Sequence, residues 1–125
     1  MTQQATRFRW DELELEKVTE MVARKVIAGA ETTLTQAYFK RGTLVPLHAH
    51  PTEILLYVLQ GAVRVQLGTE EQIVREGEVL VVAPGRPHQA ECLDDTFVLL
   101  VEPRGLKKPV EELSPGPSVV PIRGQ

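Results

Sequence analysis

The sequence predicts an all-β fold, either a sandwich or a barrel. Short apolar runs recur along the chain, glycine or proline turn signals separate them, and helical periodicity is almost absent. A length of 125 residues suits one domain with a real core. A hydrophobic content of 42% and a charged content of 25% are ordinary for a globular protein.

The first elements alternate between polar and strand-forming segments. Residues 1–9 are polar and are expected to fray. The charged segment 10–18 suits either a helical turn or a short edge strand at the surface. The segments 22–27 and 32–39 are rich in β-branched and aromatic residues, and each is followed by a glycine turn signal. Both are therefore predicted to be strands.

The segment 42–50 carries two histidines, and the strand predicted after it, 54–60, is apolar on both faces. Leucine, isoleucine and valine occupy alternate positions on one side, and leucine and tyrosine occupy the other. A strand of this kind must be covered on both faces. The expected cover is a second sheet or a partner subunit.

The second half of the chain continues the strand pattern. Segment 62–67 alternates apolar and polar residues, and a hairpin turn at Gly68 is predicted to follow it. The remaining predicted strands are 72–75, 78–83, 89–93 and 96–101. From Pro103 onward the frequent prolines exclude regular structure over most of the tail, which is expected to be disordered or to lie as an extended arm on a neighbour.

The three histidines of the chain are its strongest chemical signal. His48 and His50 are one residue apart and therefore project from the same face of a strand. His88 follows a turn-rich segment at the end of another apolar run. A single histidine in a β-protein is commonly a hydrogen-bonded structural residue. Two adjacent inward imidazoles are costly to bury without a shared partner, so the pattern favours a metal site formed by all three.

Two histidine motifs punctuated by glycine are similar to the two motifs of the cupin superfamily. They are Gly42-x5-His48-x-His50 with Gly61 closing the strand, and Gly77-Glu78-x5-Pro84-Gly85-x2-His88. The resemblance covers about residues 20–103, so residues 1–125 are interpreted as one cupin domain with peripheral segments 1–9 and 104–125. It implies an antiparallel jelly-roll β-barrel with a metal site in its mouth. The chain most resembles the small single-domain cupins that include those handling unsaturated uronates in pectin breakdown.

Two positions depart from the family pattern. Cupins usually place a glutamate or glutamine seven residues before the closing glycine, and here that residue is Ile54. Its neighbour Glu53 is a candidate fourth ligand only if a bulge shifts the strand register, so a site of three histidines is favoured. The uronate-opening relatives carry an acidic residue on the last core strand. The corresponding residue here is Leu100, with Glu102 two residues further along, which puts the same reaction in doubt.

The resemblance and the donor set together suggest a function. Three neutral imidazoles would hold a divalent transition metal (Zn, Ni, Fe, Cu or Mn) and leave positions open for an anionic, oxygen-rich small-molecule substrate of the sugar acid or 2-oxo acid class. The hypothesis is a metal-dependent isomerase, lyase or dioxygenase. Its alternative is a non-enzymatic sensor of a metal or small ligand. Gln36, Tyr38 and Arg24 are candidates for substrate binding, because their strands can face the cavity.

The composition limits which binding partners and which cellular compartment are expected. A net charge of −3 gives no electrostatic reason to expect nucleic acid or an anionic membrane as a partner. The single cysteine, Cys92, excludes an internal disulfide, and the N-terminal residues lack the apolar core of a signal peptide. A cytoplasmic location is therefore expected. The apolar strand 54–60 and the available N-terminal strands predict a homodimer.

Overall fold

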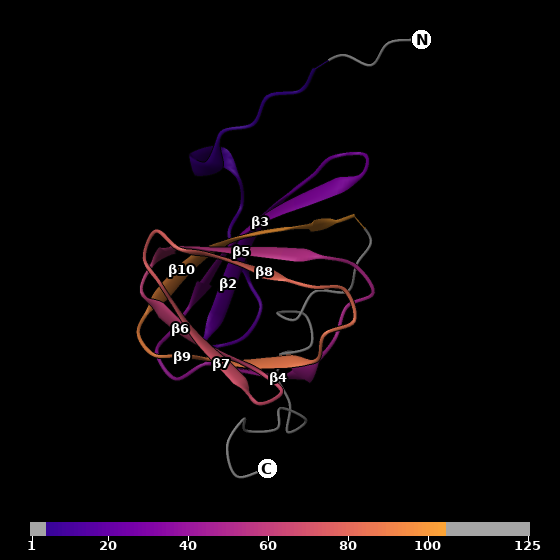
Figure 1. Ribbon diagram of the computed structural model, residues 1–125. Helices are drawn as coiled ribbons and strands as arrows, with labels where there is room; N and C mark the ends of the chain where they lie inside the picture. Colours follow the sequence, from indigo (N-terminus) through magenta and orange to yellow (C-terminus); the bar gives the residue numbers. More distant parts are fainter. Residues whose placement is uncertain (1–4, 105–125) are drawn as a thin grey trace.

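The computed structural model describes residues 5–104, and the expectations for residues 1–4 and for the tail 105–125 lie outside this range. The described chain forms a six-stranded and a four-stranded sheet, which face each other in Figure 1. The strands are β1 (Glu16–Lys17), β2 (Val22–Ala28), β3 (Thr32–Phe39), β4 (Leu44–His48), β5 (Ile54–Gln60), β6 (Ala62–Leu67), β7 (Glu70–Arg75), β8 (Val79–Val82), β9 (His88–Cys92) and β10 (Thr96–Pro103).

The strand order is that of an antiparallel jelly roll. The larger sheet has the order β1-β2-β3-β10-β5-β8, the smaller one has the order β4-β9-β6-β7, and every pairing is antiparallel. The chain crosses repeatedly from one sheet to the other. As a result, β10 pairs with both β3 and β5, although it is the last strand in sequence. This arrangement confirms the predicted fold. No helix in the described part of the chain is long and apolar enough to cross a membrane.

The core lies between the two sheets and is formed by the inward side chains of both. Val58 on β5 is fully buried, and its register partner Val98 on β10 is 1% exposed. The four-stranded sheet thus covers one of the two apolar faces of β5. On the other face Tyr57 is 37% exposed, and Leu55 and Leu59 are partly exposed.

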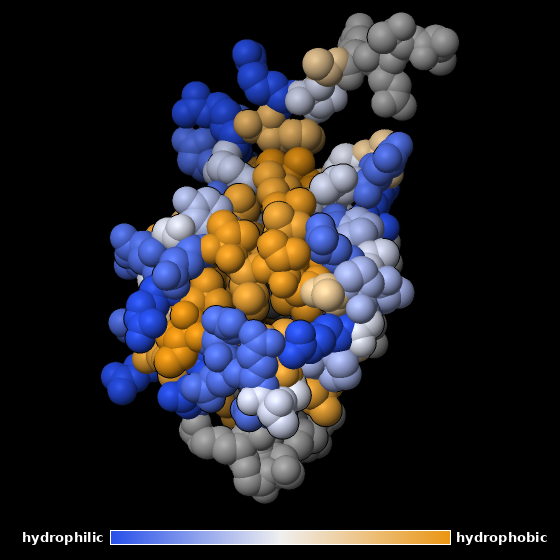
Figure 2. Space-filling view, in the orientation of Figure 1, coloured by the Kyte–Doolittle hydropathy of each residue, from blue (hydrophilic) through white to orange (hydrophobic). Residues whose placement is uncertain are grey.

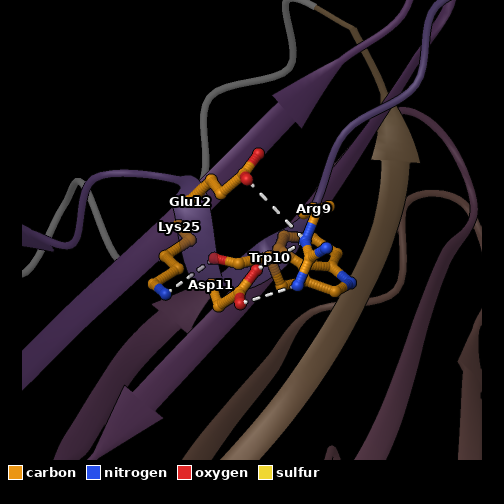
Figure 3. A network of polar contacts seen from close by, with 5 residues as sticks. All are labelled: Arg9, Trp10, Asp11, Glu12 and Lys25. Carbon is orange, nitrogen blue, oxygen red and sulfur yellow. Dashed lines mark hydrogen bonds and ion pairs between the residues drawn. The ribbon is translucent and has the colours of Figure 1, made fainter.

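The N-terminal segment contains both of its predicted alternatives, a helical turn and a short edge strand. A 3-10 turn, η1 (Trp10–Glu12), precedes β1. The Lys25 ammonium on β2 donates a hydrogen bond of 2.8 Å to the carbonyl oxygen of Trp10 (Figure 3). Arg9 pairs with Asp11 and Glu12 within the turn, where all three side chains are exposed. Exposed pairs of this kind contribute little stability, whereas the bond from Lys25 links the turn to β2.

Gly61 forms the tight connection between β5 and β6. Its φ of +94° is in the region that favours glycine. A Cβ atom at this position would lie 2.5 Å from the carbonyl oxygen of Asp95 and 2.7 Å from Oγ1 of Thr96. The turn between β5 and β6 therefore packs directly against the turn before β10, and only a residue without a side chain fits there.

Candidate metal centre

The three histidines converge at one end of the barrel interior. His48 ends β4, His50 follows it, and His88 begins β9 as the direct register partner of His48. The ring centroids of His48 and His88 are 4.2 Å apart, those of His48 and His50 are 4.7 Å apart, and those of His50 and His88 are 5.6 Å apart. One nitrogen from each ring lies within 4.8 Å of the others. Three nitrogens at such separations can bind one metal ion.

A β-bulge turns His48 into the barrel. Val45 pairs with Ala90 and His48 pairs with His88, so a step of three residues on β4 opposes a step of two on β9. The extra residue allows both Val45 and His48 to line the cavity, while Leu47 is 64% exposed. Simple alternation from Val45 would have directed Leu47 inward and His48 outward.

The turn before His88 is attached to the backbone of His50. The amide of Gly85 donates a hydrogen bond of 2.7 Å to the carbonyl oxygen of His50, and the φ of Gly85 is +72°. Farther along the turn, the Arg86 guanidinium donates to the carbonyl oxygen of Leu67 at 3.0 Å. The first contact joins the second histidine motif to the first, and the second contact ties the turn to the end of β6.

Hydrogen bonds to the backbone determine which ring nitrogen carries the proton in His48 and His88. Nδ1 of His48 lies 2.8 Å from the carbonyl oxygen of Pro46, and Nδ1 of His88 lies 2.9 Å from that of Arg86. A carbonyl oxygen only accepts, so each Nδ1 carries the proton and donates it, and each Nε2 keeps a lone pair for a metal. The Nε2 atoms of His48 and His50 are buried and have no hydrogen-bond partner among the described residues. Such atoms fit a divalent cation as their missing partner.

Burial favours the neutral form of two of the imidazoles, those of His50 and His88. The pKa of His50 is lowered to about 4, first by desolvation and then by repulsion from His48 and His88. Desolvation also lowers the pKa of His88, against the opposing effect of its hydrogen bond to the backbone at Arg86. Neutral imidazole is the form that binds a metal, so these two rings are ready to bind at neutral pH without first losing protons.

The metal-free protein is expected to lose stability as the pH falls below 6.5. The pKa of His50 is about 4 in the folded chain and 6.5 when unperturbed, so the unfolded chain binds the proton more readily. This contribution is complete above pH 6.5 and is lost as the pH falls toward 4, with a loss of about 2 kcal/mol by pH 5. Urea unfolding of chelator-treated protein at several pH values measures it. His50→Gln should flatten this slope, and an equal slope in both proteins would contradict the assignment.

The histidines open into a cavity between the two sheets with a volume of about 80 Å³. Its wall is apolar except for the histidines, Cys92 and Glu102; the remaining lining residues are Phe39, Val45, Ile54, Leu56, Val63, Val65, Leu80, Val82, Ala90, Val98 and Leu100. Burial raises the pKa of the Cys92 thiol to about 12, so the thiol stays protonated and unreactive at neutral pH. Glu102 is 2% exposed and is the carboxylate among the residues that line this cavity.

Comparison with known proteins identifies the family. The cupin domain model matches residues 37–102, which include both histidine motifs. The chain belongs to the cupin family. A curated relative, the uncharacterised protein MJ1618 of Methanocaldococcus jannaschii, is 28% identical over 75 residues, which cover 59% of this chain and 60% of that protein.

Solved structures agree with this assignment. KdgF from a Halomonas species superposes with a TM-score of 0.70 at 27% identity, covering 78% of this chain and 94% of that one. An RmlC-like cupin from Shewanella frigidimarina superposes with a TM-score of 0.72 at 20% identity, covering 82% of this chain and 94% of that one. The second likeness concerns the fold alone. KdgF is similar in both sequence and fold.

Glu53, the candidate fourth ligand, lies apart from the three histidines. Glu53 is exposed, precedes β5 and is outside the group formed by the three histidines. Ile54, in the family's ligand position, is 5% exposed and lines the cavity. Glu53 could be a ligand only with a bulge beside it, and the bulge on this segment lies instead before His48. This geometry favours a ligand set of three histidines.

The three residues considered for substrate binding do not meet at the metal centre. Gln36 and Tyr38 are on the outer face of β3, where the Tyr38 ring stacks on Phe97 with centroids 4.4 Å apart. Arg24 lies on the inward face of β2 and pairs with Glu16 at 2.9 Å. None of the three lines the cavity. Their proposed contact with substrate stays a prediction, and the function proposed below does not depend on it.

Glu102 is the cavity residue that sequence reasoning undervalued. It is two residues beyond Leu100 on β10, and both side chains line the cavity. The period of two in a strand places residues 100 and 102 on the same face, although residue type alone does not show whether that face is the inner one. The cavity therefore has a carboxylate at residue 102 and a leucine at residue 100.

Proposed function

We propose that this cupin is a metal-dependent enzyme acting on a small, anionic, oxygen-rich metabolite of the sugar acid class. The observation that carries the proposal is the meeting of three imidazoles and one buried carboxylate in a single cavity. The imidazoles come from β4, the residues after it and β9 in the smaller sheet, and the carboxylate comes from β10 in the larger sheet.

His48, His50 and His88 would hold the metal through their Nε2 atoms. Three neutral ligands suit Zn²⁺, Ni²⁺, Fe²⁺ or Cu²⁺ better than Mn²⁺, which prefers oxygen donors. When bound, such a metal supplies the positive charge of a Lewis acid, which favours an enolate or another anionic oxygen of the substrate. Because the three imidazoles bring no negative charge of their own, an anionic chelating ligand matches this site.

The dimensions of the cavity limit which part of the substrate enters. Sites that enclose a whole small molecule usually have volumes of roughly 300 to 1,000 Å³. A volume of about 80 Å³ accommodates only one end of a sugar acid. We infer that the carboxylate and its neighbouring oxygen enter, while the rest of the molecule stays in the mouth of the barrel. The apolar wall excludes water from the reacting end.

Glu102 is proposed as the group that moves a proton. A buried carboxylate beside the bound end of the substrate can take a proton from a carbon or hydroxyl next to a carbonyl and return it to a neighbouring atom. This chemistry is that of an isomerase or of a lyase. The likeness to KdgF at 27% identity, and the resemblance of the motifs to cupins that handle unsaturated uronates, support unsaturated uronates as the first substrates to test.

The decisive experiment compares wild-type protein with Glu102→Gln. Untagged protein, analysed for metal and reconstituted with Zn²⁺, Ni²⁺ or Fe²⁺, is incubated with unsaturated uronates, and loss of their ultraviolet absorbance is followed. Glu102→Gln keeps the size of the side chain and should retain metal, while turnover falls by roughly 100-fold or more. Turnover equal to wild type in Glu102→Gln would exclude the proton-transfer role.

The same samples separate the proposal from its alternatives. A metal-loaded protein that binds uronate without converting it would be a ligand sensor. Oxygen consumption in the presence of a 2-oxo acid or diol would indicate a dioxygenase instead. The proposal of an isomerase or lyase requires product formation without oxygen uptake.

A further inference from the structure

Ile54 is the inward residue of the larger sheet at the histidine end of the cavity. It begins β5 four residues after His50, and its register partner Val82 ends β8 three residues before Gly85. The amide of Gly85 is bonded to the carbonyl oxygen of His50, so both strands reach the wall of the cavity beside the histidines. Ile54 and Val82 are each 5% exposed, and both line the cavity.

The side chains of this wall offer no donor atom to a metal ion. Ile54 and Val82 are aliphatic, and so is the next inward pair, Leu56 and Leu80. Figure 2 shows apolar side chains gathered at the level of β5 and β8, the two strands of Figure 1 that form the wall. Within residues 5–104, the group of side chains that could share one metal ion consists of the three histidines and does not include Glu102. A metal held there would have three protein ligands, all of them neutral.

A metal with three neutral protein ligands keeps its full charge and has open positions. Transition metals in proteins bind four to six ligands, so at least one position is left for a molecule that is not the protein. An anion with two adjacent oxygens can supply both the missing ligands and the missing negative charge. A carboxylate on the wall would compete with such an anion for the position and would repel it.

We propose that Ile54 determines which ligand completes the metal site, because its aliphatic side chain leaves the fourth ligand position to an anionic oxygen of the substrate. This inference rests on the metal binding in the proposed function and adds to it the residue that selects the metal and its ligand. A carboxylate at residue 54 would change the donor set to three nitrogens and one oxygen, which suits Mn²⁺ better.

The position of Ile54 next to Glu102 gives the aliphatic side chain a second consequence. Val101 on β10 pairs with Leu55 on β5, so the residues that follow and precede them, Glu102 and Ile54, lie side by side on the inner face. Two buried carboxylates at such neighbouring positions would repel each other. Ile54 therefore keeps a second negative charge away from the proposed proton carrier.

The test compares Ile54→Glu with wild type in the binding of two probes, Mn²⁺ and glycolate. Competition with a chromophoric chelator measures the affinity for Mn²⁺, and calorimetry measures glycolate binding to the Zn²⁺-loaded, full-length protein. Ile54→Glu should bind Mn²⁺ more tightly than wild type by roughly 10-fold or more, since even outer-shell partners change metal affinity by this factor. It should bind glycolate more weakly by roughly 10-fold or more, because the new carboxylate repels the anion.

Leu56→Glu is the matched control for Ile54→Glu. It places the same carboxylate in the same cavity, one inward position farther from the histidines. It should leave the affinity for Mn²⁺ at the wild-type value. Ile54→Gln offers an oxygen ligand without the charge, and it should also raise the affinity for Mn²⁺. This variant decides the question if circular dichroism shows that Ile54→Glu is unfolded.

The outcomes separate this proposal from the proposed enzymatic activity. Unchanged binding of Mn²⁺ and glycolate in Ile54→Glu, or equal changes in Leu56→Glu, would overturn the role of Ile54 and leave the activity standing. If Ile54→Glu shows both changes while wild type converts no uronate, the role of Ile54 is supported and only the proposed activity fails. A wild-type protein that binds no metal would overturn both.

Discussion

Replacing His48 with alanine is expected to lower the affinity of the protein for Zn²⁺ by roughly 1,000-fold. The variant loses one of three ligands, whereas losing a single outer-shell partner already costs about 10- to 100-fold. Nε2 of His48 is buried without a partner, and its Nδ1 is held by the carbonyl oxygen of Pro46, so the ring is fixed toward the site. Competition with a chromophoric chelator, and metal content after purification, measure the loss.

Glu53→Ala is the matched control for His48→Ala. Glu53 is close in sequence but exposed, and the histidine group does not include it. The variant should therefore bind Zn²⁺ as tightly as wild type. Equal losses in the two variants would show that Glu53 is a ligand and that the register of the segment between β4 and β5 is different. The folded state of each variant is checked by circular dichroism, which should be unchanged.

The strands and the histidine cluster could be predicted from the sequence because their signals are local. Predicted segments 32–39, 54–60 and 62–67 have the same bounds in the structure, since a glycine turn or a change in side-chain pattern marks their ends. His48 and His50 were paired because alternate residues share one face of a strand, and His88 was the remaining candidate for the same ion. In the structure β4 ends at His48 and His50 follows it, so the two rings converge through the bulge and the segment after β4 and not through strand alternation. Neither inference needed knowledge of how the sheets pack.

The direction of side chains on mixed strands could not be predicted in the same way. On β3 the inward residues include Thr33 and Thr35, which are buried, while the outward residues include Leu34 and Tyr38. Residue type alone does not distinguish these two faces, and Tyr38 was considered for the cavity because its strand could face it. The bulge before His48 is also invisible in the sequence, because it depends on the pairing of β4 with β9.

The same limitation applies to Glu102. Both faces of β10 are apolar from Phe97 to Val101, so residue type does not distinguish the core side from the outer side. Only the pairing of β10 with β3 and β5 shows that Glu102 lies beneath the smaller sheet, where it lines the cavity. A site assembled from two sheets depends on their packing, and a disturbance of that packing should affect the carboxylate and the histidines together.

The turn between β5 and β6 leaves no room for one added carbon atom at Gly61. Gly61→Ala is expected to destabilise the fold by about 4 kcal/mol, because the added Cβ would be 2.5 Å from the carbonyl oxygen of Asp95 and the backbone is in a glycine-favouring conformation. Small domains are stable by roughly 5 to 15 kcal/mol, so this loss is a large fraction of the total. Urea midpoints at constant pH measure it.

Gly42→Ala separates the two causes of that loss. Gly42 has a φ of +89°, close to the +94° of Gly61, but a Cβ placed there has no atom within 4 Å. Its substitution should therefore cost only the backbone strain, about 1 to 2 kcal/mol. The difference between the two variants measures the steric conflict at the contact of Gly61 with the Asp95 and Thr96 turn. If both variants lost the same amount, the strain of the backbone would account for the whole effect and the close packing of the two turns would have no energetic role.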